Sequence, residues 1–120
     1  VVDDDPDAVE LVRLSLAETG VRLLTAANGQ QALTLLDRER VDFIILDLLM
    51  PVMDGLTFLS RVKADERLRR IPVLVLTSKS LTDEERQQLQ QQALKILKKA
   101  EFVAKDLEEV LRDVSRRISG

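Results

Sequence analysis

The chain has 120 residues, of which 45% are hydrophobic and 32% are charged, and its formal net charge is −3. This length and apolar content suit one folded domain with its own core, over residues 1–120, and exclude a disordered chain. The mild acidity gives no overall attraction to nucleic acid or anionic lipid, and no apolar run is long enough to cross a bilayer, so we expect no nucleic-acid or membrane partner.

Apolar and amphipathic segments alternate along the whole chain. The apolar runs are typical of strands that are covered on both faces of a parallel sheet, and the amphipathic segments repeat apolar residues at helical spacing. In chain order, the sequence predicts a strand at 1–2 that looks truncated, a helix at 7–19, a strand at 22–26, a helix at 30–38, a strand at 41–46, a helix at 56–64, a strand at 73–76, a helix at 83–92 and a strand at 94–97.

Local signals set the ends of several of these elements. Gly20 is expected to close the first helix, and Pro72 marks the start of the fourth strand. Thr82 and Glu85 have the spacing of a capping box, which places the start of the next helix at Asp83. That helix is rich in glutamine and has few apolar anchors, which indicates either a mobile element or a solvated face. A last helix carries the apolar stripe Leu107, Val110, Leu111, Val114 and Ile118.

Strands that alternate with helices in this way predict an α/β fold. With five of each, the expected architecture is a doubly wound, five-stranded parallel sheet with right-handed crossovers. Ligands of such sheets lie beyond the carboxyl ends of the strands. The polar residues expected at that edge are the acidic run 3–5, Asp47, Thr77, Ser78, Lys98 and Lys99.

Two absences narrow the chemistry at this edge. The chain has no cysteine and no histidine, so thiol nucleophiles, zinc–thiolate sites and the usual base of neutral pH are excluded. A chain without cysteine is typical of a reducing compartment, and we expect a cytoplasmic protein. Any metal must be a hard cation on carboxylate oxygens, with Mg²⁺ the first choice. Carboxylates, such a cation and a lysine together make a phosphate site, in which a carboxylate can act as nucleophile.

The acidic run at the start has two interpretations. Three adjacent aspartates fit a solvated turn with a helix cap, and they also fit a cation site. Because Pro6 suits the first position of a helix, Asp5 is the natural N-cap. This leaves Asp3 and Asp4 as the metal pair, facing Asp47 across the sheet edge.

Several motifs together resemble the receiver domains of two-component response regulators, the CheY-like family. The letters VVDD at the start are similar to the acidic pair of that family, and DLLMPVMDG, residues 47–55, is similar to its phosphoacceptor signature. Thr77 and Lys99 follow Asp47 at the spacings that the family pattern requires, which selects Lys99 over Lys98. The resemblance extends over essentially the whole chain and implies the flavodoxin-like strand order 2-1-3-4-5.

The resemblance implies a role for each matching residue. Asp47 would accept a phosphoryl group from a phosphohistidine of a partner histidine kinase or phosphotransfer protein. Asp4 and Asp47 would bind Mg²⁺ directly, together with the backbone carbonyl of Leu49, and Asp3 would act through a metal-bound water. Lys99 would pair with the phosphoryl oxygens.

The resemblance also implies how the signal leaves the site. Thr77 would turn inward to hydrogen-bond the phosphoryl oxygens. This would move the loop after the fourth strand and the surface of the helix that follows it, to which an output partner would bind. A dimer that forms on phosphorylation is a further expectation. The domain would assist its own phosphorylation and dephosphorylation, and we do not expect a turnover enzyme.

Two positions depart from residues common in the family, and two more flank the phosphoacceptor. Ile96 stands where the family often has an aromatic residue, so a Tyr or Phe rotamer switch is not available. Ala100 stands in place of the usual proline, so the usual cis peptide is not expected. Leu49 and Lys79 flank the path of attack on the phosphoryl group. Because Leu49 offers no hydrogen bond to a hydrolytic water, we expect slow self-dephosphorylation.

Two other functions fit parts of the pattern. The acidic run satisfies the Asp-x-Asp motif of haloacid-dehalogenase-type phosphohydrolases, although the cap insertion and the downstream acidic pair of that class are not evident. A degenerate receiver that serves only as a docking module is the second alternative, and the full set of site residues argues against it. The sequence names neither the kinase nor the output partner, and both a free-standing regulator and a receiver of a hybrid kinase fit it.

Overall fold

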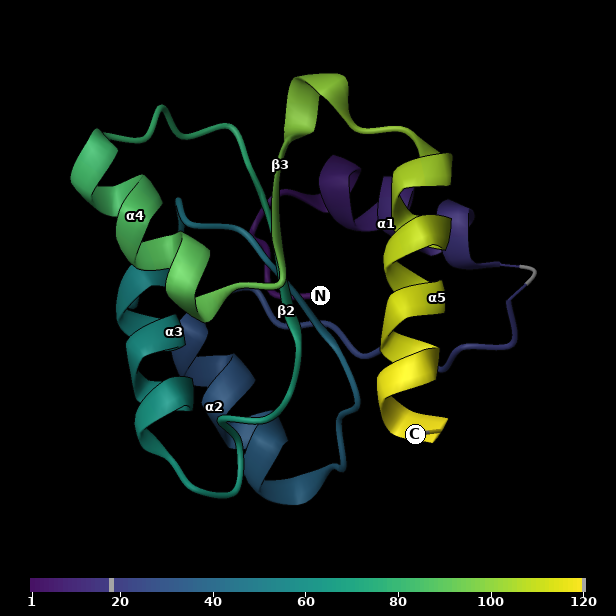
Figure 1. Ribbon diagram of the computed structural model, residues 1–120, viewed down its shortest axis with the longest axis horizontal. Coiled ribbons are helices and arrows are strands. Elements are labelled where there is room, and N and C mark those ends of the chain that lie inside the picture. Colours follow the sequence, from purple (N-terminus) through teal and green to yellow (C-terminus); the bar gives the residue numbers. More distant parts are fainter. Residues whose placement is uncertain (18, 120) are drawn as a thin grey trace.

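A parallel sheet separates the helices into two layers (Figure 1). The protein is described from a computed structural model that covers residues 1–17 and 19–119, the last three of these by their backbone only. The helices are α1 (Pro6–Leu16), α2 (Gly29–Arg38), α3 (Gly55–Ala64), α4 (Asp83–Gln92) and α5 (Ala104–Ser119), with a 3₁₀ turn at Lys99–Glu101. Figure 1 shows α1 and α5 on one side of the sheet and α2, α3 and α4 on the other. Among the helices described, none combines the length and the apolar character that a membrane span requires.

The sheet has the predicted order, although its first two positions are very short. Strands β1 (Ile44–Leu46), β2 (Val73–Thr77) and β3 (Lys95–Lys98) pair in parallel in the order β1-β2-β3. Val2 extends this sheet because it forms parallel bridges to both Leu46 and Ala26. The spatial order is therefore Ala26, Val2, β1, β2, β3, which corresponds to 2-1-3-4-5. The predicted fold is confirmed, with bridges in place of the first two full strands.

Proline limits the pairing between β1 and β2. The backbone N–H of Ile44 donates to the carbonyl of Pro72 at 3.0 Å. The next hydrogen bond of a parallel ladder would need an N–H on Pro72, which proline lacks. The strand that was predicted to begin at residue 41 therefore begins at Ile44.

The first helix is shorter than predicted. It was expected to run to Thr19 and to close at Gly20, but α1 ends at Leu16. Both the backbone N–H and the hydroxyl of Thr19 donate to the carbonyl of Leu16, at 3.0 and 2.7 Å. This side chain caps the last turn, and Gly20, with a φ of 75°, lies in the turn that follows.

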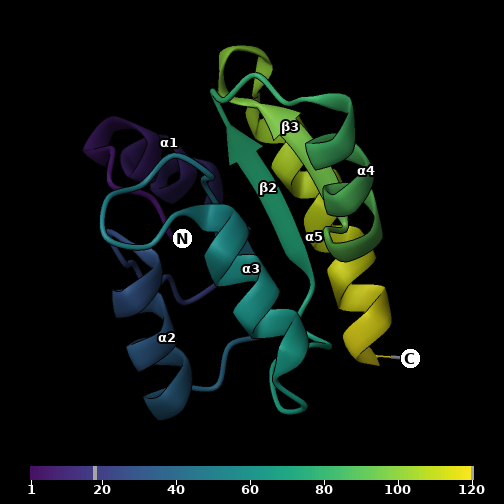
Figure 2. The ribbon, with the colours of Figure 1, turned by 90° about the vertical axis from the view of Figure 1, so that its left-hand side faces the viewer.

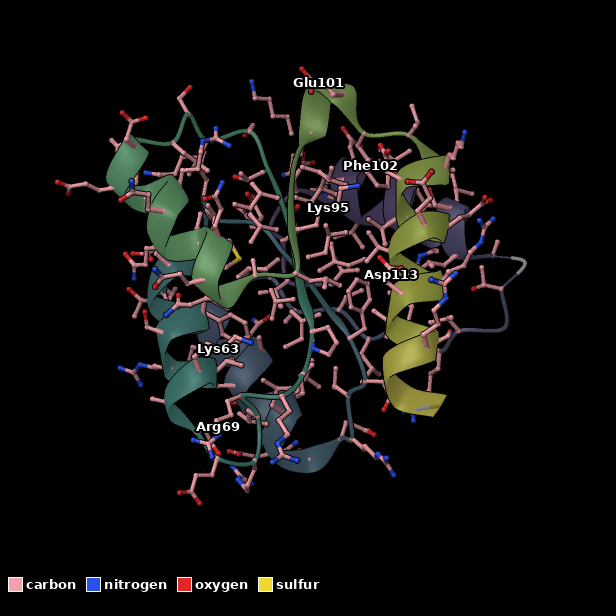
Figure 3. All side chains as sticks on the ribbon, in the orientation of Figure 1. Lys63, Arg69, Lys95, Glu101, Phe102 and Asp113 are labelled. Carbon is pink, nitrogen blue, oxygen red and sulfur yellow. The ribbon has the colours of Figure 1, made fainter. Side chains whose placement is uncertain are left out.

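The core lies on both faces of the sheet. One buried cluster joins β1 and β2 to α2, α3 and α4, and it contains Phe58, Leu59, Val62 and Leu89. The other joins the opposite face to α1 and α5, and it contains Val12, Leu16, Phe102, Leu107, Val110 and Val114. Figure 3 shows Phe102 between the end of β3 and α5. The predicted stripe of α5 is confirmed where side chains are described, while Ile118 lies outside those residues.

Candidate functional site

Polar residues from four segments converge at the carboxyl edge of the sheet. Asp47 follows β1, Thr77 ends β2, Lys99 follows β3, and Asp3 and Asp4 follow the first bridge. Figure 2 shows β2 and β3 pointing toward this one edge. The exposed fractions of Asp3, Asp47 and Thr77 are 6%, 3% and 2%, whereas Asp4 is exposed. The convergence that the sequence predicted is therefore present, with two carboxyl groups held out of solvent.

The carboxylate of Asp47 accepts hydrogen bonds at both oxygens. Its Oδ1 accepts from the hydroxyl of Thr77 at 2.9 Å and from the backbone N–H of Leu49 at 3.2 Å. Its Oδ2 accepts from Lys99 Nζ at 3.2 Å. Because a buried charge is costly unless it is paired, these contacts explain how Asp47 stays in place inside the protein.

Lys99 holds a second carboxylate that the sequence did not assign to it. Its Nζ lies 2.9 Å from Asp3 Oδ2, closer than to Asp47. Burial raises the pKa of Asp3, although the amide of Asp5 and then Lys99 act against this rise. Burial lowers the pKa of Lys99, but its hydrogen bond to Asp3 and the charges of Asp3 and Asp47 outweigh burial, and the pKa is raised. Lys99 is therefore a protonated bridge between two carboxyl groups.

Asp5 has the structural role that the sequence predicted for it. Its side chain accepts from the backbone N–H of Asp7 at 3.0 Å, with Pro6 at the first helical position. Its own backbone N–H donates to Asp3 Oδ1 at 2.9 Å. The start of α1 therefore fixes one oxygen of Asp3, while Lys99 fixes the other.

The hydroxyl of Thr77 already faces Asp47 in this structure. The contact with phosphoryl oxygens that the resemblance implies for this hydroxyl stays a prediction. A buried hydroxyl needs a hydrogen-bond partner, and the carboxylate of Asp47 supplies one without phosphorylation. The same hydroxyl oxygen accepts from the backbone N–H of Lys79 at 3.1 Å, so Thr77 is held from both sides.

Three carboxylates have the spacing that a hard cation needs. One oxygen from each of Asp3, Asp4 and Asp47 lies within 4.8 Å of the others. Oxygens on opposite sides of one Mg²⁺ ion are roughly 4 Å apart. A small movement of the three carboxylates toward one another would therefore let their oxygens contact one ion. The direct contacts of Asp4 and Asp47 and the contact of Asp3 through water stay predictions. The backbone carbonyl of Leu49 stays a predicted ligand.

The segment between β1 and α3 is shaped by two close contacts. Asp54 caps α3 by accepting from the backbone N–H of Thr57 at 2.8 Å. A Cβ on Gly55 would overlap the carbonyl of Asp47 and the Cα of Leu48, so only glycine fits there. The start of α3 therefore lies directly against the backbone of Asp47.

The departures from the family pattern are compatible with this site. Ile96 is half-buried and packs against the core cluster beneath α4. The described residues contain no cis peptide bond, so the bond between Lys99 and Ala100 is trans, and a 3₁₀ turn begins at Lys99. Lys98 is exposed, whereas Lys99 reaches the carboxylates, as the spacing predicted.

Comparison with known proteins identifies the class. Residues 1–112 match the family described as the response regulator receiver domain. The chain belongs to this family, and the resemblance noted in the sequence is confirmed.

Individual relatives differ in how much of their length the chain covers. It is 38% identical over 78 residues to RpaA, a DNA-binding dual master transcriptional regulator of Synechocystis, and this match covers 65% of the chain and 32% of RpaA. A protein of 14.6 kDa from Leptolyngbya boryana is also 38% identical over 78 residues, which are 65% of the chain and 60% of that protein. The chain thus spans between about a third and three fifths of these relatives.

Solved structures of receiver domains have the same fold. The signal receiver domain of a histidine kinase from Syntrophus aciditrophicus superposes with a TM-score of 0.83 at 32% identity, covering 94% of this chain and 85% of that one. The receiver domain of the sensor histidine kinase PA1611 from Pseudomonas aeruginosa superposes with a TM-score of 0.80 at 30% identity. The match covers 99% of this chain and 94% of that one. The PA1611 structure has a magnesium ion coordinated in its active-site cleft.

Proposed function

We propose that this receiver domain is a phosphorylation-dependent switch in which Asp47 accepts a phosphoryl group from a phosphohistidine. The donor would be a partner histidine kinase or a phosphotransfer protein. The observation that carries the proposal is the convergence of a hydroxyl and an ammonium group, from Thr77 and Lys99, on the carboxylate of Asp47. A carboxylate that only capped a helix would accept from backbone N–H groups and would need neither of them.

The residues present supply the nucleophile and two hydrogen-bond donors for the transfer. A carboxylate oxygen of Asp47 forms the new bond to phosphorus, the bond between phosphorus and the imidazole nitrogen breaks, and its electron pair leaves with the imidazole. Because a carboxylate nucleophile has no proton to give up, no general base is needed, in keeping with a chain without histidine. Lys99 and Thr77 donate to the phosphoryl oxygens, so catalysis consists of positioning and charge neutralisation.

The acidic cluster supports a divalent cation at the same place. Three carboxylates beside one ammonium group have a formal charge of −2, which one divalent ion would balance. Asp4 and Asp47 would hold Mg²⁺ directly, with the backbone carbonyl of Leu49, and Asp3 would contact it through water. Bound Mg²⁺ would neutralise charge on the phosphoryl oxygens.

The surroundings of Asp47 favour a long-lived phosphoryl group. Leu49 lies beside the site with 48% of its surface exposed and has no polar side-chain atom to orient a water. We therefore infer slow self-dephosphorylation and no turnover of other substrates. The cytoplasmic location and a dimer formed on phosphorylation stay predictions.

Phosphorylation by a small donor tests the proposal. The chain is incubated with Mg²⁺ and acetyl phosphate, and its intact mass is measured. We expect one added phosphoryl group, lost in Asp47→Asn and with EDTA. Asp54→Asn is the matched control, because it removes a carboxylate from the same segment and retains a side chain that caps α3. No uptake from any donor, or uptake in Asp47→Asn, would overturn the proposal, and sustained hydrolysis of a phosphate ester would favour the phosphohydrolase.

A further inference from the structure

A second lysine lies beside the site and is held by the following helix. The Nζ of Lys79 forms an ion pair with Glu85 Oε2 at 3.0 Å, and the two side chains are only 29% and 22% exposed. Apart from the pairs of Lys99, this is the least exposed ion pair among the residues described. The contact is thus a defined feature of the segment between β2 and α4.

Glu85 has a second role in the same segment. Its Oε1 accepts from the backbone N–H of Thr82 at 3.1 Å, and Thr82 Oγ1 accepts from the backbone N–H of Glu85 at 3.1 Å. This capping box and then Lys79 lower the pKa of Glu85, which keeps the carboxylate charged at neutral pH. One carboxylate therefore fastens the loop to the first turn of α4 at two points.

The backbone of Lys79 is linked to the proposed phosphoacceptor through the hydroxyl of Thr77. Its backbone N–H donates to Thr77 Oγ1 at 3.1 Å, and that oxygen lies 2.9 Å from Asp47 Oδ1. The ammonium group stands at the end of a flexible four-carbon stem. One cleft is lined by Lys79, Thr77 and Lys99 together.

We propose that Lys79 is a second cationic ligand of the phosphoryl group, which it reaches by leaving Glu85. This inference rests on the proposed function of Asp47. A phosphoryl group adds charge and three strong acceptor oxygens at the site, whereas Glu85 offers one negative charge. When Lys79 leaves Glu85 for the phosphoryl group, Glu85 keeps only its capping-box contacts, and the first turn of α4 loosens. Helix α4 as a whole has a single buried residue, Leu89.

Two variants that break the same ion pair separate this role from a structural one. Lys79→Met removes the ammonium group, whereas Glu85→Gln releases it and retains an oxygen that can accept from Thr82. Affinity is measured for beryllofluoride with Mg²⁺, a mimic of a phosphoryl group, by fluorine NMR. We expect Lys79→Met to weaken binding and Glu85→Gln to strengthen it, each about threefold. The double variant should match Lys79→Met.

Hydrogen exchange gives a second measurement. On addition of beryllofluoride, the amides of the first turn of α4 should lose protection in the unmodified chain and in Lys79→Arg, but not in Lys79→Met. Glu84→Gln is the matched control, because Glu84 lies on the same turn and carries the same charge. Thermal unfolding by circular dichroism verifies that each variant is folded.

The outcomes distinguish this inference from the proposed function. If the unmodified chain takes up no beryllofluoride, both fail. If it does, but the two variants change affinity in the same direction or leave it within twofold, the role of Lys79 is wrong and the role of Asp47 stands. A change in Glu84→Gln equal to that in Glu85→Gln would also overturn the inference, because it would indicate a general effect of charge.

Discussion

Helices α3 and α4 both follow strands that end at the site, and both have ten residues and a side-chain N-cap. They are held in very different ways. Helix α3 buries Gly55, Phe58, Leu59 and Val62, whereas α4 buries only Leu89. At its start, α3 lies against the backbone of Asp47, while α4 depends on the polar contacts of Glu85.

This difference shows how one site can be both rigid and responsive. Apolar burial through α3 fixes the backbone of Asp47, the proposed nucleophile, because closely packed side chains leave little room to move. Polar contacts at the start of α4 can be exchanged for others when a new charge appears nearby. The backbone of Asp47 is therefore held by apolar packing, whereas the start of α4 is held by polar contacts.

The largest expected effect comes from truncating the apolar anchor of each helix. Phe58→Ala should lower the free energy of unfolding by about 3–5 kcal/mol, because it empties a fully buried position of the main core cluster. Leu89→Ala should raise hydrogen exchange mainly within α4, since no other residue of that helix is buried. Urea unfolding and amide exchange measure the two effects. If Leu89→Ala accelerated amide hydrogen exchange in β2 as much as in α4, α4 would be as firmly tied to the core as α3, which would contradict the contrast between the two helices.

The helix caps provide a smaller test. Asp54→Ala and Thr82→Ala each remove a side chain that accepts from the first turn, at a cost of about 1 kcal/mol of local helix stability. We expect the urea midpoint to fall for Asp54→Ala, because α3 is part of the core, and to change less for Thr82→Ala. Asp54→Ser and Thr82→Ser retain a cap and serve as controls. A larger fall for Thr82→Ala would mean that α4 is as firmly integrated as α3.

The smallest effect is a pH dependence at the start of α4. The backbone hydrogen bond with Thr82, and then Lys79, lower the pKa of Glu85 below its ordinary value of 4.5. A lowered folded-state pKa contributes stability above the unfolded value, and this contribution is lost as pH falls through the folded value. The exchange protection of α4 should therefore differ between the unmodified chain and Glu85→Gln at pH 7, and converge below pH 4.5. A difference that persists after Glu85 has been protonated in the folded chain, as followed by NMR titration of its side chain, would exclude the charge of Glu85 as its cause.

The elements were predictable where a local signal fixed them. The capping box of Thr82 and Glu85 placed α4 at its observed bounds. Gly20 predicts a later end for α1 than the observed one, because the side chain of Thr19 caps the helix earlier. The strand expected at 22–26 is reduced to a bridge at Ala26, because a strand depends on its partner and not on its own residues alone.

The site was predictable in its members but not in their pairing. The carboxyl ends of parallel strands meet at one edge, so Asp47, Thr77 and Lys99 were expected together. The ion pairs of Lys99 with Asp3 and of Lys79 with Glu85 were not foreseen. Each depends on where a long, flexible side chain lies after folding, which neither periodicity nor motif spacing determines.

The inward hydroxyl of Thr77 has a consequence for the speed of the reaction. Because the hydroxyl already points at Asp47, a transferred phosphoryl group would meet an oriented donor, without the delay and entropic cost of a rotamer change. The hydroxyl need only replace one anionic oxygen by another as acceptor. Any reorganisation on the proposed phosphorylation would then fall on the loop and helix beyond Thr77, where a partner could detect it.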